Sequence, residues 1–87
     1  MPNLTEQAVL EIAKGVVAAR QLGFDTQEGF RVRFDGPEKL RDGVWKAVWT
    51  VAYVTPPGFI DQRDHFIYVD DATGEFLYII TPTGYIE

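Results

Sequence analysis

The single histidine of the chain is the first residue whose type suggests chemistry. His65 lies between Asp64 and Phe66. A zinc site needs three or four suitable ligands, so a lone histidine does not form one. A general base needs an orienting carboxylate, and Asp64 points to the opposite side of a strand from its neighbour. We therefore interpret His65 as a surface residue at a strand end, and we predict no metal ion and no cofactor.

Acidic side chains gather in the last third of the sequence. They are Asp61, Asp64, Asp70, Asp71 and Glu75. A calcium loop needs oxygen ligands at alternating positions and a glutamate at its twelfth residue, a spacing that is missing here. The acids therefore belong to turns, or they form one acidic edge that binds a basic protein partner. Residues 51–87 contain Arg63 against six acids, and this balance disfavours duplex nucleic acid and anionic membranes.

A third set of residues combines aromatic rings with cations. It consists of Arg31, Arg33, Lys46, Phe66, Tyr68 and Tyr78. Rings flanked by cations on a sheet are typical of a platform for single-stranded nucleic acid, but no RNA-recognition signature is present and the net charge of -5 opposes it. The same residue types are enriched at protein interfaces, which favours a homodimer or another protein partner. Alternatively, loops and the tail of the chain itself cover this face.

The chain lacks the residue combinations of common catalytic sites. It contains no Ser/His/Asp set, no glycine-rich phosphate loop and no pair of carboxylates at a defined spacing. The absence of cysteine excludes disulfides, thiolate metal sites and a cysteine nucleophile. Its 87 residues form one small domain and leave no room for a Rossmann unit or a barrel of helices and strands. We therefore expect a protein that is not an enzyme.

A period of 3.6 residues predicts one helix over residues 4–22. Its apolar stripe consists of Val9, Ile12, Ala13 and Val16. Asn3 and Glu6 have the spacing of a capping box, and Gly23 is expected to adopt the left-handed conformation that ends the helix. Gly15, at the flank of the stripe, indicates close packing against another backbone.

After the helix the period changes to two, which predicts strands. We expect them at about 30–34, 44–54, 65–70 and 75–81. The turn Asp71-Ala72-Thr73-Gly74 joins the last two strands, with Val69 opposite Leu77 and Tyr68 opposite Tyr78. The expected fold is a single α+β domain over residues 1–87, with one N-terminal helix packed on a four-stranded antiparallel meander.

One helix does not cover both faces of this sheet. Nineteen helical residues span about 28 Å at 1.5 Å per residue, enough for one face. The strands are apolar on both faces, so a partner, a second copy of the chain, or the tail with Tyr85 and Ile86 is expected to cover the other.

The segments VWKAVWTVAYV and HFIYVDDATGEFLYII resemble PepSY-type modules and small cystatin-like, or nuclear-transport-factor-like, bacterial immunity proteins. The resemblance implies a cystatin-like fold and a non-enzymatic protein-binding or inhibitory function. The protein would then occlude a toxin or restrain a peptidase. In that pattern the second sheet face is usually polar, whereas here it carries Phe66, Tyr68 and Tyr78.

A second functional hypothesis is a small-ligand-binding or enzymatic cystatin-like domain with a pocket between helix and sheet. Trp45, Trp49, Tyr53 and His65 would line that pocket. The first residues carry no basic segment followed by an apolar run, and no apolar stretch approaches the length of about 18 residues that spans a bilayer. We therefore expect a cytoplasmic protein without membrane contact.

Overall fold

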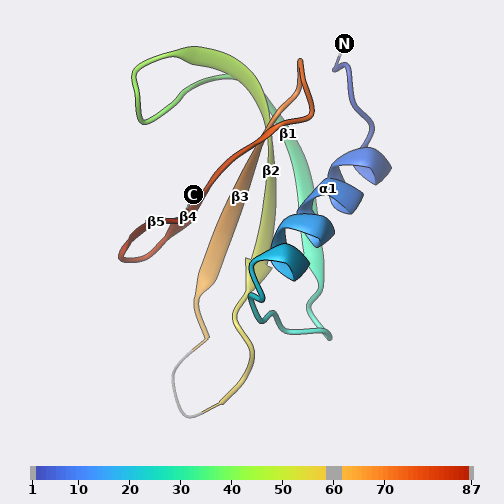
Figure 1. Ribbon diagram of the computed structural model, residues 1–87, viewed down its shortest axis with the longest axis vertical. Helices are drawn as coiled ribbons and strands as arrows, with labels where there is room; N and C mark the ends of the chain where they lie inside the picture. Colours follow the sequence, from blue (N-terminus) through green and yellow to red (C-terminus); the bar gives the residue numbers. More distant parts are fainter. Residues whose placement is uncertain (1, 59–61, 87) are drawn as a thin grey trace.

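The computed structural model describes residues 2–58 and 62–86. One helix precedes five strands along the chain: α1 (Glu6–Ala19), β1 (Phe30–Lys39), β2 (Trp45–Val54), β3 (Asp64–Asp70), β4 (Phe76–Thr81) and β5 (Gly84–Ile86). The strands form one antiparallel sheet in the order β1-β2-β3-β4-β5, and α1 lies across one face of it (Figure 1). The fold is α+β, as expected.

The sheet has five strands rather than the expected four. The tail pairs with β4 as β5, with Ile80 opposite Tyr85. β1 is also longer than expected, since it continues to Lys39 past a bulge at Asp35. Gly36 follows the bulge with a φ of 69°. Pro37 has no backbone N–H to donate, and β1 tolerates it because an edge strand has a neighbour on one side only.

The helix is shorter than the sequence predicts, and other residues cap it. The Thr5 hydroxyl accepts a hydrogen bond from the Ala8 N–H at 3.1 Å and forms the N-cap. The expected cap at Asn3 is therefore wrong. At the other end Gln21, not Gly23, is left-handed with a φ of 54°. Its N–H bonds the Ala18 carbonyl, and the next N–H bonds the Val17 carbonyl, which is the Schellman pattern.

Two glycines differ from expectation in their surroundings. Gly15 is exposed, and a Cβ atom built there would meet nothing within 4 Å, so the predicted close packing is wrong. Gly23 is the glycine that packs closely. A Cβ atom there would lie 2.7 Å from Cγ of Pro56, so the segment after α1 approaches the end of β2 only because this side chain is absent.

The core lies between α1 and the sheet. The expected helix stripe is confirmed, with Ile12 half-buried at its margin. The buried cluster consists of Val9, Ala13, Val16, Val17, Trp49, Val51, Tyr53, Ile67, Val69 and Ile79. Each of the sheet residues lies on the face that α1 covers, and we call the opposite face the outer face.

The hairpin of β3 and β4 keeps the expected register only in part. Tyr68 lies opposite Tyr78 as predicted, but Val69 lies opposite Phe76. Leu77 is therefore the extra residue of a bulge, which turns it to the side of Tyr78. The shift arises because the Asp70 N–H bonds the Glu75 carbonyl at 2.9 Å, so four residues form the loop.

We predict that Gln21→Gly stabilises the fold by about 0.5–1 kcal/mol. A residue with a Cβ atom is strained in the left-handed conformation, and glycine removes this strain. The free energy gained exceeds the free-energy cost of the larger conformational entropy that glycine gives the unfolded chain. Urea unfolding followed by circular dichroism measures the change. Gln7→Gly in the exposed helix is the control and should lose about 1 kcal/mol. A loss of stability in Gln21→Gly would contradict the cap assignment.

Candidate functional site

Among residues 2–58 and 62–86, Asp71 is the carboxylate that accepts the most hydrogen bonds, and the sequence assigns it either to a turn or to an acidic edge. In the structure it is 3% exposed. Its Oδ1 accepts from the Trp49 indole N–H at 2.7 Å and from the Leu4 N–H at 3.0 Å. Its Oδ2 accepts from the Asn3 N–H at 2.8 Å. Asp71 therefore joins the N-terminal segment, β2 and the hairpin of β3 and β4 from inside the molecule.

These donors determine the ionisation of Asp71. Burial by itself would raise the pKa of this carboxyl, because it disfavours the charged form. The backbone N–H groups of Asn3 and Leu4 and the Trp49 indole stabilise the carboxylate, and together they hold its pKa below the usual value. The group is thus an anion at neutral pH.

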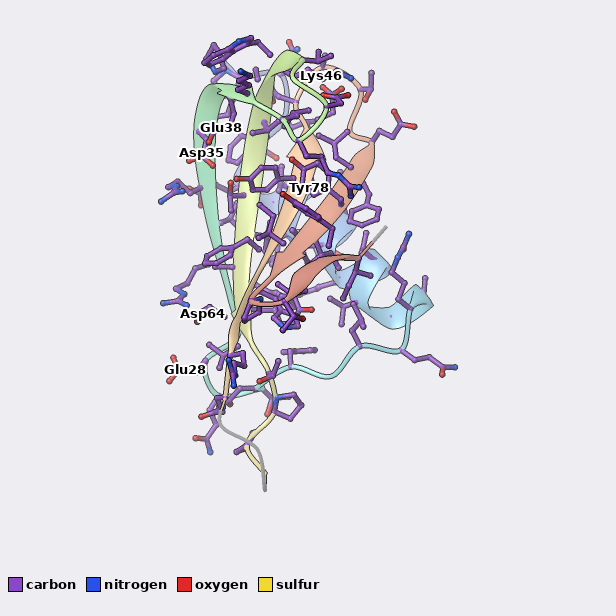
Figure 2. The ribbon with its side chains drawn as sticks, turned by 90° about the vertical axis from the view of Figure 1, so that its left-hand side faces the viewer. Glu28, Asp35, Glu38, Lys46, Asp64 and Tyr78 are labelled. Atoms are coloured by element: carbon purple, nitrogen blue, oxygen red, sulfur yellow. The ribbon has the colours of Figure 1, made fainter. Side chains whose placement is uncertain are left out.

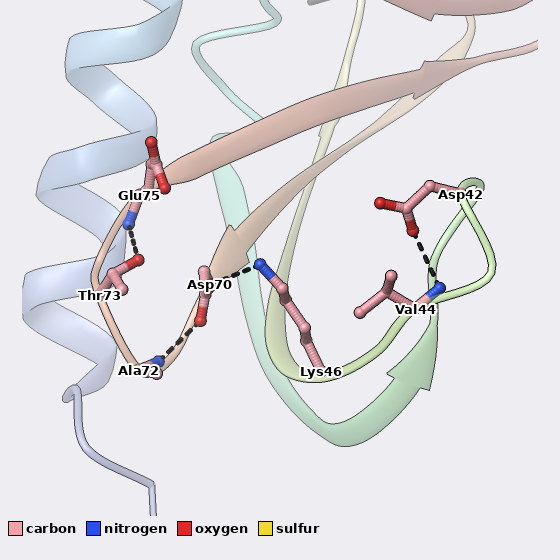
Figure 3. A network of polar contacts seen from close by, with 7 residues as sticks. All are labelled: Asp42, Val44, Lys46, Asp70, Ala72, Thr73 and Glu75. Carbon is pink, nitrogen blue, oxygen red and sulfur yellow. Dashed lines mark hydrogen bonds and ion pairs between the residues drawn. The ribbon is translucent and has the colours of Figure 1, made fainter.

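The remaining acids do not form one edge. Asp70 is buried, and its carboxylate accepts from the Ala72 N–H at 2.9 Å and pairs with Lys46 Nζ at 3.4 Å (Figure 3). Asp64 begins β3 and therefore lies at its other end, where it pairs with Arg31 at 3.6 Å. Figure 2 shows this separation, with Lys46 and Asp64 near opposite ends of the sheet. Asp61 lies outside the described residues.

The protein's own chain covers the upper part of the outer face. Figure 1 shows the hairpin of β1 and β2 bending away from the side of α1. Its loop buries Leu40, and the Arg41 N–H bonds the Tyr78 hydroxyl at 3.2 Å. The Arg41 guanidinium lies 4.3 Å from the ring centre of Tyr85. Tyr78, at 7% exposure, is therefore largely an interior residue and not an open contact surface.

The lower part of the outer face stays accessible. Phe66 is 37% exposed there. It lines a shallow depression together with Arg31, Arg33, Thr50 and Asp64. We call these five residues the Phe66 patch. Tyr68 lies two residues after Phe66 in β3 and therefore on the same face. It is half-buried, and its ring centre lies 5.3 Å from that of Tyr78. The structure thus brings Arg31, Arg33 and Phe66 together as predicted.

Carboxylates of the same chain hold both arginines of the Phe66 patch. Arg33 Nε donates to Asp35 at 2.6 Å, and Arg31 pairs with Asp64. The Thr50 hydroxyl donates to the other oxygen of Asp35. Sequence reasoning missed Asp35 and Thr50, although the Asp-Gly pair at 35–36 is a signal for the bulge that places this carboxylate.

The expected pocket between helix and sheet is not formed by the four residues predicted for it. Trp49 and Tyr53 are buried in the core, whereas Trp45 is 65% exposed near the end of the β1–β2 hairpin. His65 is half-buried, and its Nδ1 lies 3.0 Å from the Tyr53 hydroxyl. Burial lowers the pKa of His65, while the charge of Asp64 acts in the opposite direction.

Comparison of the chain with protein-family models, curated proteins and solved structures finds no match. Within residues 2–58 and 62–86, no three His, Cys, Asp or Glu side chains come together in a way that could hold a metal ion. In the same ranges, no helix is long and apolar enough to cross a membrane.

We predict that Asp71→Ala lowers the free energy of unfolding by about 3 kcal/mol. The substitution removes charge-assisted hydrogen bonds and leaves the buried Trp49 indole without its acceptor. Urea unfolding measures the loss. Glu75→Ala, an exposed acid of the same hairpin, is the matched control and should change the stability by less than about 0.5 kcal/mol. Equal effects of the two substitutions would contradict the bonding role of Asp71.

Acid unfolding should depend on Asp71 in a defined direction. Because its pKa is lowered in the folded chain, the carboxylate stabilises the fold fully above about pH 4, and this stabilisation is lost as the pH falls through the folded pKa. The stability difference between the wild type and Asp71→Asn should therefore shrink toward acid pH. Asp25, whose pKa the Gln62 side chain lowers, is present in both proteins and cancels. A difference that stays constant from pH 7 to pH 2 would overturn this assignment.

Proposed function

We propose that the protein is a non-enzymatic protein-binding or inhibitory module that docks a partner protein on the Phe66 patch. The observation that carries the proposal is the exposure of Phe66 on β3, the middle strand of the sheet, in a depression that it shares with two ion-paired arginines of β1. Aromatic residues and arginine are the types most enriched at interface centres, where they supply much of the binding energy.

The charges of the patch favour a protein over a nucleic acid. Each arginine stands beside a carboxylate, Arg31 with Asp64 and Arg33 with Asp35. The two pairs cancel in charge, whereas a nucleic acid groove needs an excess of cations. Both arginines keep most of their side-chain surface in solvent. Arg33, which its hydrogen bond to Asp35 holds in place, therefore offers a partner N–H donors in a set position, which lowers the entropy lost on binding.

A different protein fits this surface better than a second copy of the chain. Stable dimer interfaces bury about 1,200–2,000 Å² and are strongly apolar when they are obligate. Here Tyr78, Leu40 and Val48 are already buried within the chain, so much of the apolar area expected for a dimer is used internally. In the Phe66 patch itself, one exposed ring lies beside two ion pairs, the composition of a non-obligate contact.

The resemblance of the β2 and β3–β4 segments supplies the finer proposal. Within a cystatin-like fold, the module would be an immunity-type protein that occludes a toxin or a PepSY-like module that restrains a peptidase. A basic partner was the expectation from the acidic half of the chain. Since Asp70 and Asp71 are buried and bonded within the chain, we propose instead a partner that carries both signs of charge around an apolar pocket for Phe66.

Photocrosslinking in the source cell tests the proposal. We expect p-benzoylphenylalanine at position 66 to form an adduct with one protein, whose identity distinguishes a toxin from a peptidase. The same group at Gln7, on the exposed side of α1, should not form it. Arg33→Glu should abolish the adduct, and Lys14→Glu, a charge reversal of equal size on the helix, should not.

Three results would overturn it. The first is that the crosslinking group forms the same adducts at position 7 as at position 66. The second is that the Arg33→Glu variant, with a wild-type circular dichroism spectrum, still forms the adduct. The third is an adduct of twice the chain mass, which would replace the partner protein by a homodimer.

A further inference from the structure

A second hollow lies away from the Phe66 patch and is lined by residues of the β4–β5 hairpin and of the start of β3. Its volume is about 520 Å³. One wall carries Arg63 and His65, and the other carries Pro82, Thr83 and Ile86. A cation, an imidazole and a hydroxyl thus share a small space with apolar groups.

Backbone hydrogen bonds fix the position of Arg63. Its N–H donates to the Thr55 hydroxyl at 2.8 Å, and its carbonyl accepts from the Thr55 N–H at 2.9 Å. Its side chain makes no ion pair with any residue of 2–58 or 62–86. Arg63 therefore contributes to the lining of the hollow a positive charge that no carboxylate among those residues neutralises.

The contact with Tyr53 orients the imidazole of His65. The hydroxyl of Tyr53 lies 3.0 Å from Nδ1 and stays protonated, because burial raises its pKa. It contacts no other hydrogen-bond acceptor among residues 2–58 and 62–86, so we assign its proton to the bond with Nδ1. The neutral ring then carries its proton on Nε2, at the opposite edge of the imidazole. Burial lowers the pKa of His65, so this neutral form prevails at pH 7. His65 thus adds an N–H donor to the hollow.

We propose that this hollow binds a small monocarboxylate with an apolar body. Arg63 binds the carboxylate, Nε2 of His65 donates one hydrogen bond to it, and Pro82 and Ile86 contact the apolar part. One cation matches the single charge of a carboxylate better than the double charge of a phosphate. The apolar wall adds the area that an aromatic or branched acid would bury.

The β4–β5 turn gives the hollow a defined shape. The Thr81 hydroxyl donates to the Gly84 carbonyl at 3.0 Å and accepts from the Thr83 N–H at 3.3 Å. These bonds hold Pro82 and Thr83 at the tip of the hairpin. The site stands independently of the proposed protein-binding function, since it shares no residue with the Phe66 patch.

Titration of the ¹⁵N-labelled protein with benzoate at pH 7, followed by NMR, tests the proposal. Saturable shifts are expected at the amides of Arg63 and residues 83–86 and at the ring of His65. Arg63→Gln should raise the Kd for benzoate about tenfold. Lys14→Gln removes one exposed charge from the helix instead and should leave the Kd unchanged, as should Phe66→Glu.

Further probes define the ligand class. Benzamide, the neutral isostere, should not saturate the same shifts. If N-acetylphenylalanine binds more tightly than benzoate, the carboxylate comes from a peptide carboxyl terminus. If benzoate binds more tightly, the ligand is a free organic acid. Shifts that do not saturate, equal effects of Arg63→Gln and Lys14→Gln, or tighter binding of inorganic phosphate than of benzoate would each overturn the proposal.

Discussion

The rest of the structure depends on the buried carboxylate of Asp71. Asp71 belongs to the β3–β4 hairpin, and its carboxylate accepts hydrogen bonds from the N-terminal segment and from Trp49 of β2. A buried anion is stable only when donors surround it, so the three segments are held in one arrangement. Because the segment before α1 is tied to the hairpin, the helix begins beside the β3–β4 turn, and its apolar stripe meets the core residues of β2, β3 and β4.

The curvature of the sheet then determines which surface is left for a partner. The bulge at Asp35 allows β1 and β2 to continue as a bent hairpin, whose loop buries Leu40 and satisfies the Tyr78 hydroxyl. One end of the outer face thereby becomes interior. The same bulge places the Asp35 carboxylate against Arg33 and Thr50 at the border of the accessible end. A single irregularity in an edge strand therefore both closes one part of the face and orders the charges of the other.

The two proposed sites use different physical devices. The Phe66 patch presents an aromatic ring beside two balanced ion pairs, an arrangement suited to a protein surface of mixed charge. The hollow at the β4–β5 turn places Arg63 beside a neutral imidazole and apolar residues, an arrangement suited to one small anion. The backbone around each site is held by ladder or turn hydrogen bonds, so both are formed before any ligand arrives, which favours binding without a large ordering cost.

Periodicity and turn chemistry in the sequence by themselves determine the α+β class, the helix face, the three central strands and the pairing of Tyr68 with Tyr78. These features depend on neighbours two to four positions apart, whose types are visible in the chain. The tertiary structure alone decides that Asp71 is interior, because its donors at Asn3 and Trp49 are 68 and 22 positions away. It also decides that Tyr78 is covered and Phe66 is not. Both results follow from the bend of the β1–β2 hairpin, whose loop reaches across the sheet. The alternation of residues along a strand assigns each residue to one face of the sheet, but it does not say what covers that face.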